Sequence, residues 1–128
     1  MDNKILITAA IFGVLSIVLG AFGAHALKEL IPVTSQQTFE TGVRYQMYHA
    51  LFLLFIGSAN LLTQKTKNVI YYLTLIGVVF FSGSIYFLAT NTLTNFDFKV
   101  IGFITPIGGL LLMLSWLTLF VNFLKNKC

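Results

Sequence analysis

The run ILITAAIFGVLSIVLGAFGAHAL, from Ile5 to Leu27, decides the fold because its 23 residues include no charged side chain. As an α-helix it would be about 34 Å long, since each residue adds ~1.5 Å. About 20 apolar residues are enough to cross the hydrocarbon core of a bilayer. The run is also longer than the apolar part of a secretory signal peptide. We therefore expect a transmembrane helix that is retained in the protein.

The composition extends this expectation to the whole chain. Only 9% of the 128 residues are charged, whereas a soluble domain has about 25% charged residues. Such a chain cannot cover a globular surface with polar groups, and it has no room for a separate catalytic or nucleic-acid-binding domain. We predict an all-α fold, an integral membrane four-helix transmembrane bundle, with residues 1–128 in a single domain. The predicted helices span about 5–27, 35–63 with the membrane span from 45, 69–90 and 100–124.

The second predicted helix begins before the bilayer. Thr34 and Gln37 have the form of a capping box, in which two side chains bond the unpaired amides at the start of a helix. A start near Ser35 gives this helix a short interfacial extension before the span. Glu40 and Arg44 stand four residues apart in the order that favours an ion pair. That pair would lower the cost of holding an arginine at the membrane edge.

The distribution of charge predicts the orientation. Four spans place both termini and the loop after the second helix on one side of the membrane. That side carries five basic residues and the other carries three, and an excess of lysine and arginine marks the cytoplasmic side. We expect both termini in the cytoplasm and the protein in a bacterial plasma membrane. The basic residues are Lys4, Lys65, Lys67, Lys125 and Lys127 on the first side, and Lys28, Arg44 and Lys99 on the second.

Small residues recur at helical spacing in the first and fourth predicted helices. Such stripes let the backbones of neighbouring helices approach closely. A proline within the fourth helix cannot donate to the carbonyl four residues earlier, so we expect a bend there. The alternatives are a pathway lined by backbone in the first helix and an unwound segment near a ligand in the fourth. The predicted packing or kink residues are Gly13, Ser16, Gly20, Gly23, Ala24, Gly102, Pro106 and Gly109.

Polar residues of the four helices fall in the half of the bilayer away from the termini. The other half is nearly featureless apart from Asn60 and Trp116. Polar side chains in a span usually face the interior of the bundle, because lipid offers them no partner. We predict a shared hydrogen-bonded layer, either around a small cavity or as a dry network that fixes helix register. Its residues are His25, Arg44, Gln46, His49, Ser82, Ser84, Tyr86 and Thr105.

The sequence predicts no metal site and no cofactor. Cys128 is the single cysteine, so the chain cannot form an internal disulfide or a thiolate metal cluster. Paired carboxylates, a Ser/His/Asp set and a phosphate-binding loop are also missing from the sequence. These features argue against an enzyme. The net charge of +4 reflects membrane topology rather than a nucleic-acid-binding surface.

Four ordered motifs resemble the membrane family called domain of unknown function 423, which is related to the eukaryotic transmembrane protein 256 family. The resemblance covers nearly the whole chain and implies a four-helix integral membrane protein. It implies no known reaction, and only a general association with membrane integrity or homeostasis. The motifs are GAFGAHAL at 20–27, FETGVRYQMYHAL at 39–51, FSGSIY at 81–86 and TPIGG at 105–109, followed by Trp116.

Three functions remain open at this point. The first is a non-enzymatic protein that supports the membrane or envelope by binding lipids or another membrane protein, including a second copy of itself. The second is a small transporter or channel with a polar vestibule, in which His49 titrates near neutral pH. The third is a haem-binding or redox protein in which His25 and His49 are paired ligands. The expected partners are membrane lipids and a homo-oligomer or another membrane protein.

Overall fold

The computed structural model describes residues 2–93 and 101–125, and these residues form an all-α structure. Four long helices carry the chain, as the apolar runs predict. They are α1 (Asp2–His25), α2 (Val33–Ser58), α3 (Gln64–Ala89) and α4 (Ile104–Lys125), with a short 3₁₀ turn, η1 (Asn91–Leu93), after α3.

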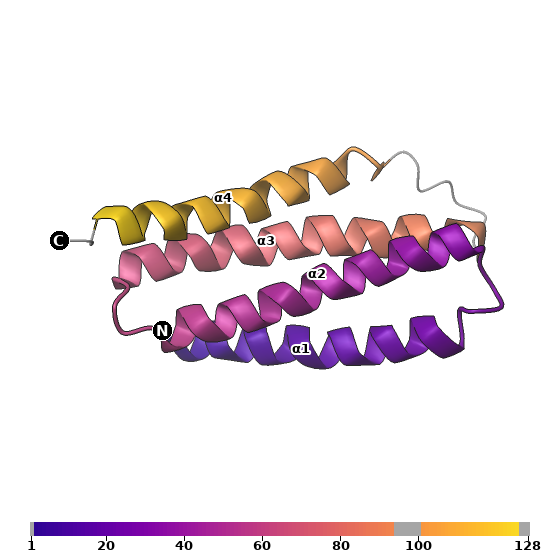
Figure 1. Ribbon diagram of the computed structural model, residues 1–128, viewed down its shortest axis with the longest axis horizontal. Helices are drawn as coiled ribbons and strands as arrows, with labels where there is room; N and C mark the ends of the chain where they lie inside the picture. The colour runs from indigo at the N-terminus through magenta and orange to yellow at the C-terminus, as the bar shows by residue number, and fades with distance from the viewer. Residues whose placement is uncertain (1, 94–100, 126–128) are drawn as a thin grey trace.

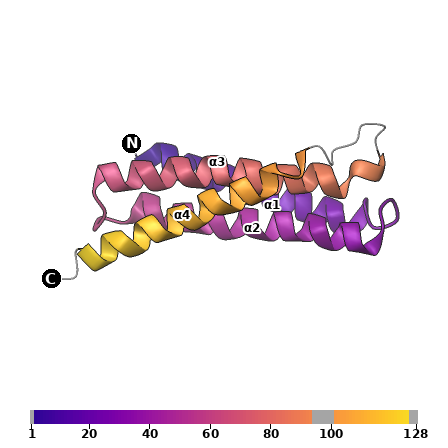
Figure 2. The ribbon, with the colours of Figure 1, turned by 90° about the horizontal axis from the view of Figure 1, so that it is seen from above.

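Consecutive helices run antiparallel along one long axis (Figure 1). α2 lies between α1 and α3, and α4 packs on the other side of α3, which it crosses obliquely in Figure 2. We call one end of the molecule the terminal end, because α1 begins there, α4 ends there and α2 connects there to α3. The opposite end, where α1 connects to α2, is the far end.

The start of α2 differs from the prediction. The helix begins at Val33, and its N-cap residue is Pro32, with no capping hydrogen bond from a side chain. The predicted capping box of Thr34 and Gln37 is therefore wrong. The neighbouring Gln36 stabilises this end of the helix in another way. Its side-chain amide donates to the carbonyl oxygen of Lys28 at 2.8 Å, which joins the α1–α2 connection to the first turn of α2.

The start of α3 lies five residues before the predicted one. The side-chain oxygen of Thr63 accepts a hydrogen bond from the backbone amide of Thr66 at 3.3 Å, which caps the helix. Threonine is a favourable N-cap residue because it satisfies an amide that has no partner within the helix. As a result Lys65 and Lys67, predicted in a turn, lie in the first turn of α3. α2 correspondingly ends at Ser58 and not near residue 63.

The predicted bend at Pro106 is wrong for a similar reason. α4 begins at Ile104, so Pro106 is the third residue of the helix. Amides in the first turn have no partner within a helix, and proline is tolerated there without breaking it. Gly102, predicted as a kink residue, lies before the helix begins.

Glycines set the closest contacts between helices, although not all of the predicted ones do. A Cβ atom on Gly23 would lie 2.8 Å from the Phe39 ring, and one on Gly20 would lie 3.4 Å from Val43, so both residues let α1 approach α2. By contrast, a Cβ on Gly13 would meet no atom within 4 Å. Gly13 therefore does not pack closely against another helix within the described chain.

The other predicted small residues divide in the same way. Gly109 packs near the Phe81 ring, 3.5 Å from an added Cβ. Ser16 is buried, and its hydroxyl donates to the carbonyl oxygen of Phe12 in its own helix at 2.8 Å. Ala24 is exposed within the single chain.

Among the glycines whose surroundings the structure describes, Gly108, which belongs to the TPIGG motif, makes the tightest approach. A Cβ there would collide with the backbone of Phe81. Gly77 on α3 plays the reciprocal part, since a Cβ on it would lie 2.8 Å from the Leu112 side chain of α4. Close contact between α3 and α4 therefore depends on one glycine from each helix.

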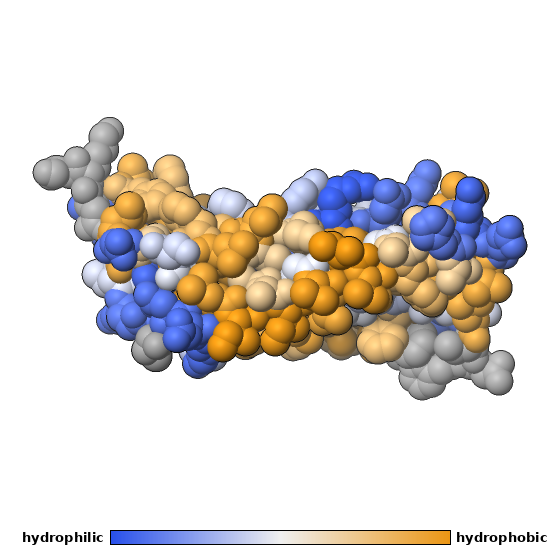
Figure 3. Space-filling model, turned by 90° about the horizontal axis from the view of Figure 1, so that it is seen from below, coloured by the Kyte–Doolittle hydropathy of each residue, from blue (hydrophilic) through white to orange (hydrophobic). Residues whose placement is uncertain are grey.

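The surface has the character of a protein that lies in lipid. The core between α2 and α3 buries Leu53, Ile56 and Ile70 completely, yet large apolar side chains elsewhere stay exposed, such as Ile17 on α1 at 66% and Phe120 on α4 at 58%. In Figure 3 a hydrophobic band runs along the middle of the molecule and hydrophilic residues gather toward both ends. α1, α3 and α4 are each long and apolar enough to cross a membrane.

Candidate functional site

Gln46 is the centre of the polar layer. Its side chain is buried in α2, with only 4% of the residue exposed. The amide nitrogen donates to the carbonyl oxygen of Phe12 in α1 at 2.9 Å. The amide oxygen accepts a hydrogen bond from the Tyr86 hydroxyl of α3 at 2.6 Å. One side chain thus joins three helices, as expected for a residue that faces the interior.

Two serines of α3 complete this layer. The Ser82 hydroxyl donates to the carbonyl oxygen of Gly42 in α2 at 2.7 Å. A Cβ on Gly42 would lie 2.9 Å from Ile85 and from the Tyr86 ring, so a glycine is required for this close approach. The Ser84 hydroxyl bonds the hydroxyl of Thr105 and so connects α3 to the first turn of α4.

His49 connects α2 to α4 through a tryptophan. The indole nitrogen of Trp116 donates to His49 Nε2 at 3.1 Å, and His49 Nδ1 lies 2.7 Å from the carbonyl oxygen of Tyr45. An indole N–H is only a donor, so Nε2 must be the unprotonated nitrogen and Nδ1 must carry the proton. Both nitrogens of a neutral imidazole are therefore engaged within the protein.

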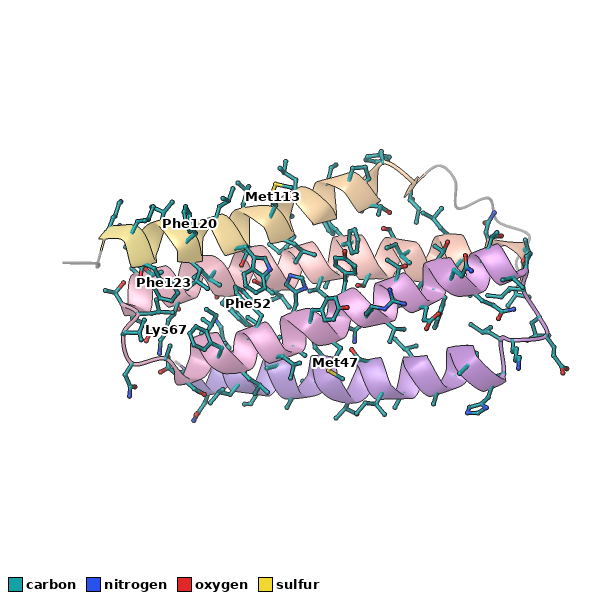
Figure 4. The ribbon with its side chains drawn as sticks, viewed as in Figure 1. Met47, Phe52, Lys67, Met113, Phe120 and Phe123 are labelled. Carbon is teal, nitrogen blue, oxygen red and sulfur yellow. The ribbon has the colours of Figure 1, made fainter. Side chains whose placement is uncertain are left out.

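Aromatic packing surrounds this histidine. The rings of Phe52 and Trp116 lie 4.1 Å apart between centroids, and Figure 4 shows Phe52 on α2, pointing away from α1. Beside them is a shallow groove of about 220 Å³. Its lining residues are Tyr45, His49, Phe81, Gly109, Leu112, Met113 and Trp116.

Two predicted residues do not join the layer. His25 ends α1 with an exposed side chain, while His49 is buried in the second half of α2, so the structure does not bring the two histidines together as paired ligands. Arg44 is half exposed and forms the predicted ion pair with Glu40, at 3.7 Å. The other six predicted residues all make hydrogen bonds between helices.

The polar layer is deeper than predicted. Gln46 is the fourteenth of the 26 residues of α2, so it lies at mid-helix rather than in the half near the far end. The half near the terminal end is not featureless either. The hydroxyls of Thr74 in α3 and Ser115 in α4, both fully buried, lie 2.6 Å apart. Trp116, expected among the isolated residues of that half, belongs to the layer through His49.

A second cluster at the terminal end ties α1 to α3. Lys67, labelled in Figure 4, has a side chain only 5% exposed, and its amine pairs with the Asp2 carboxylate at 3.0 Å. The amine of Lys4 donates to the Tyr72 hydroxyl at 2.5 Å, and the hydroxyls of Thr8 and Tyr71 lie 2.9 Å apart. Sequence reasoning missed this cluster. The available signal was the position of Tyr71 and Tyr72 beside lysines at a helix start.

The polar groups of the interior are bonded to one another. Among residues 2–93 and 101–125, one buried side-chain oxygen or nitrogen has no hydrogen-bond partner, Asp2 Oδ1. Within the same residues, His, Cys, Asp and Glu side chains do not gather in groups of three that could hold a metal ion. Within the described residues, the polar groups of the layer are therefore used mainly in hydrogen bonds that join helices.

The fold and this network define a small, all-α, multi-pass membrane protein whose helices are joined by buried hydrogen bonds. The chain belongs to the DUF423 family: the family model described as "Protein of unknown function (DUF423)" matches residues 19–109. The matched segment contains all eight predicted layer residues and ends before Trp116.

Relatives over nearly the full length are bacterial membrane proteins. A UPF0382 membrane protein of Staphylococcus haemolyticus is 40% identical over 120 residues, which are 94% of each chain. One from Haemophilus influenzae is 35% identical over 99% of this chain and 98% of its own. The UPF0382 inner membrane protein of Escherichia coli is 33% identical over 95% and 90%. No solved structure matches this chain.

Proposed function

We propose that this protein is a non-enzymatic membrane protein that supports membrane integrity by binding lipid, or a partner membrane protein, on its outer surface. The observation that carries the proposal is the use of the interior polar groups. Gln46, His49 and Ser82 each make at least one hydrogen bond to a neighbouring helix. Groups engaged in this way hold the bundle together, and the surface is left to interact with other molecules.

The proposal includes four crossings of the membrane. α1 and α3 are both apolar enough to cross, and both begin at the terminal end (Figure 1). α2 must therefore return the chain to that end. It is more polar than its neighbours, but Gln46 and His49 are bonded inside the bundle, which lowers the cost of their burial. The first turns of α2 would form the interfacial part of this helix.

The same proposal places both termini in the cytoplasm. The terminal end of the described structure carries four basic residues and one acidic residue, Asp2. The basic residues are Lys4, Lys65, Lys67 and Lys125. An excess of basic residues favours the cytoplasmic side.

Non-enzymatic binding is favoured over transport and over redox chemistry by the same geometry. A transport route needs polar groups that can exchange partners with a solute, whereas the described interior groups bond across helix interfaces. A haem site needs an imidazole nitrogen that can bind iron, and both nitrogens of His49 are already engaged.

Native mass spectrometry of protein released from mild detergent tests the proposal. We expect retained lipid, or a defined complex with a second copy or another membrane protein. A strictly monomeric protein that retains no lipid, and captures no partner after crosslinking in the membrane, would contradict it.

A further inference from the structure

A groove of about 390 Å³ opens between α1 and α2 in the half of the molecule near the far end. Its apolar lining comes from both helices, and its polar lining comes from α2 alone. The lining residues are Gly20, Gly23 and Ala24 on α1, and Gln36, Phe39, Glu40, Val43 and Arg44 on α2.

The two α1 glycines keep the floor of this groove low. A Cβ on Gly20 would lie 3.4 Å from Val43, and one on Gly23 would lie 2.8 Å from Phe39, so both positions are close to apolar α2 side chains. On the groove side of α1, three residues before Gly20, Ile17 is exposed. The groove is therefore continuous with the apolar surface that faces lipid, and it has the chemistry to accept part of an acyl chain.

The two charged residues of the groove form an ion pair that leaves most of their hydrogen-bonding groups available for a ligand. The side chains of Arg44 and Glu40 are 50% and 69% exposed, and their closest charged atoms are 3.7 Å apart. Arg44 has five N–H donors in a planar fork, and this single long contact uses few of them. The two residues stand four apart in the same helix, so the pair does not join α2 to another helix.

The depth of the pair makes a polar partner important. Arg44 precedes Gln46 by two residues and Glu40 precedes it by six, about 3 Å and 9 Å along the helix axis. Gln46 bonds Phe12, at the middle of α1. Both charges thus lie beside the apolar part of α1, within about 15 Å of its centre, which is half the thickness of a hydrocarbon core. Charges at this depth need partners other than lipid tails.

We propose that this groove binds the headgroup of an aminophospholipid such as phosphatidylethanolamine, with the Arg44 guanidinium on the phosphate and the Glu40 carboxylate on the primary ammonium. One acyl chain lies against Gly20 and Gly23. The assignment rests on the proposed function and names its ligand.

The chemistry of the two charges selects this headgroup among membrane lipids. Arginine suits phosphate because its donors match two phosphate oxygens at once. A carboxylate beside that phosphate would repel a headgroup that carries only negative charge. It favours one with a positive group attached, and a primary ammonium also has N–H donors, which a quaternary ammonium lacks.

The test is native mass spectrometry of the full chain with equal amounts of phosphatidylethanolamine, phosphatidylcholine and phosphatidylglycerol of matched acyl chains. Arg44→Gln should weaken phosphatidylethanolamine binding by about tenfold, the effect of losing a charge-assisted hydrogen bond. Glu40→Gln should keep phospholipid binding but lose the preference for phosphatidylethanolamine. The matched controls are Lys28→Gln and Glu29→Gln, at the same end but outside the groove, and both should behave as the wild type.

The possible results separate the two proposals. Wild-type protein that binds all three lipids equally, with no change in Arg44→Gln, would overturn the groove assignment and leave lipid binding as the function. Wild-type protein that binds no lipid would overturn the assignment, and would overturn the proposed function as well if no partner is captured. A dimer that Arg44→Gln dissociates would also overturn the assignment, because the groove would then be occupied by a second copy. Circular dichroism of each variant verifies the helical fold.

Discussion

Gln46 shows how one buried side chain can determine the register of three helices. Its amide has one donor directed to α1 and one acceptor directed to α3, and sliding either neighbour by one residue would break a bond. In lipid the apolar surfaces of helices attract each other no more than they attract lipid tails, so such specific contacts choose among alternative packings.

Gln46→Leu should lower the free energy of unfolding by about 1–2 kcal/mol, because it leaves the buried Tyr86 hydroxyl without its acceptor. The double variant Gln46→Leu with Tyr86→Phe should recover part of that loss, since neither polar partner is then left unpaired. The measurement is unfolding in detergent micelles by titration with sodium dodecyl sulfate. Strictly additive losses in the double variant would show that the two side chains do not interact.

The contact between His49 and Trp116 has a specific optical readout, because Trp116 is the single tryptophan of the chain. His49→Phe removes the acceptor of the indole N–H, so the tryptophan emission maximum should move to shorter wavelength. His25→Phe is the matched control, and it should leave the emission unchanged because His25 is exposed at the end of α1. Equal shifts in the two variants would contradict the contact.

At the scale of the helices, the interface of α3 and α4 depends on close backbone approach. Gly108 meets the backbone of Phe81, and Gly77 meets Leu112. The hydroxyls of Thr74 and Ser115 then come within hydrogen-bond distance in the same interface. Small residues and a hydroxyl pair therefore act together, as is typical of helix contacts in membranes.

Gly108→Ala should destabilise the protein by about 1–3 kcal/mol, because the added methyl group forces α4 away from the α3 backbone. Gly13→Ala is the control, since its added methyl group meets no atom within 4 Å. That control should be neutral or slightly stabilising, because alanine favours a helix more than glycine does. The measurement is the same detergent unfolding titration, and equal losses in both variants would contradict the packing explanation.

At the scale of the whole molecule, the orientation can be tested with single cysteines in a Cys128→Ser background. Lys28→Cys lies at the far end and Lys65→Cys at the terminal end. A thiol reagent that cannot cross the membrane should label the first in intact cells and the second only after the membrane is opened, because basic residues favour the cytoplasmic side. The reverse pattern would contradict the proposed orientation.

The existence of the helices was predictable because lipid requires long apolar runs, and hydropathy detects them directly. Their ends were not, because they depend on local bonds such as the Thr63 cap, which a hydropathy pattern does not contain. The error at Pro106 followed from this, since the effect of a proline depends on how far it stands from the helix start.

The inward direction of Gln46 and His49 was also predictable, because polar groups avoid lipid. Their partners were not. Trp116 of α4 donates to His49 of α2, and α4 crosses the bundle obliquely (Figure 2). From the sequence, the hydroxyls of Thr74 and Ser115 would each be expected to bond a carbonyl of their own helix. Their pairing becomes visible only when the register of α3 and α4 is known. Pairings across interfaces are thus a property of three-dimensional packing and not of local sequence.

The cluster at the terminal end also has a consequence for the order of events during synthesis. Asp2 and Lys4, in the first turns of α1, find their partners on Lys67 and Tyr72 of α3. A ribosome makes those partners more than sixty residues later. The hairpin of α1 and α2 can therefore assemble before Asp2 and Lys4 have their partners. These two contacts form only once α3 has been made, and they then join the start of the chain to its middle.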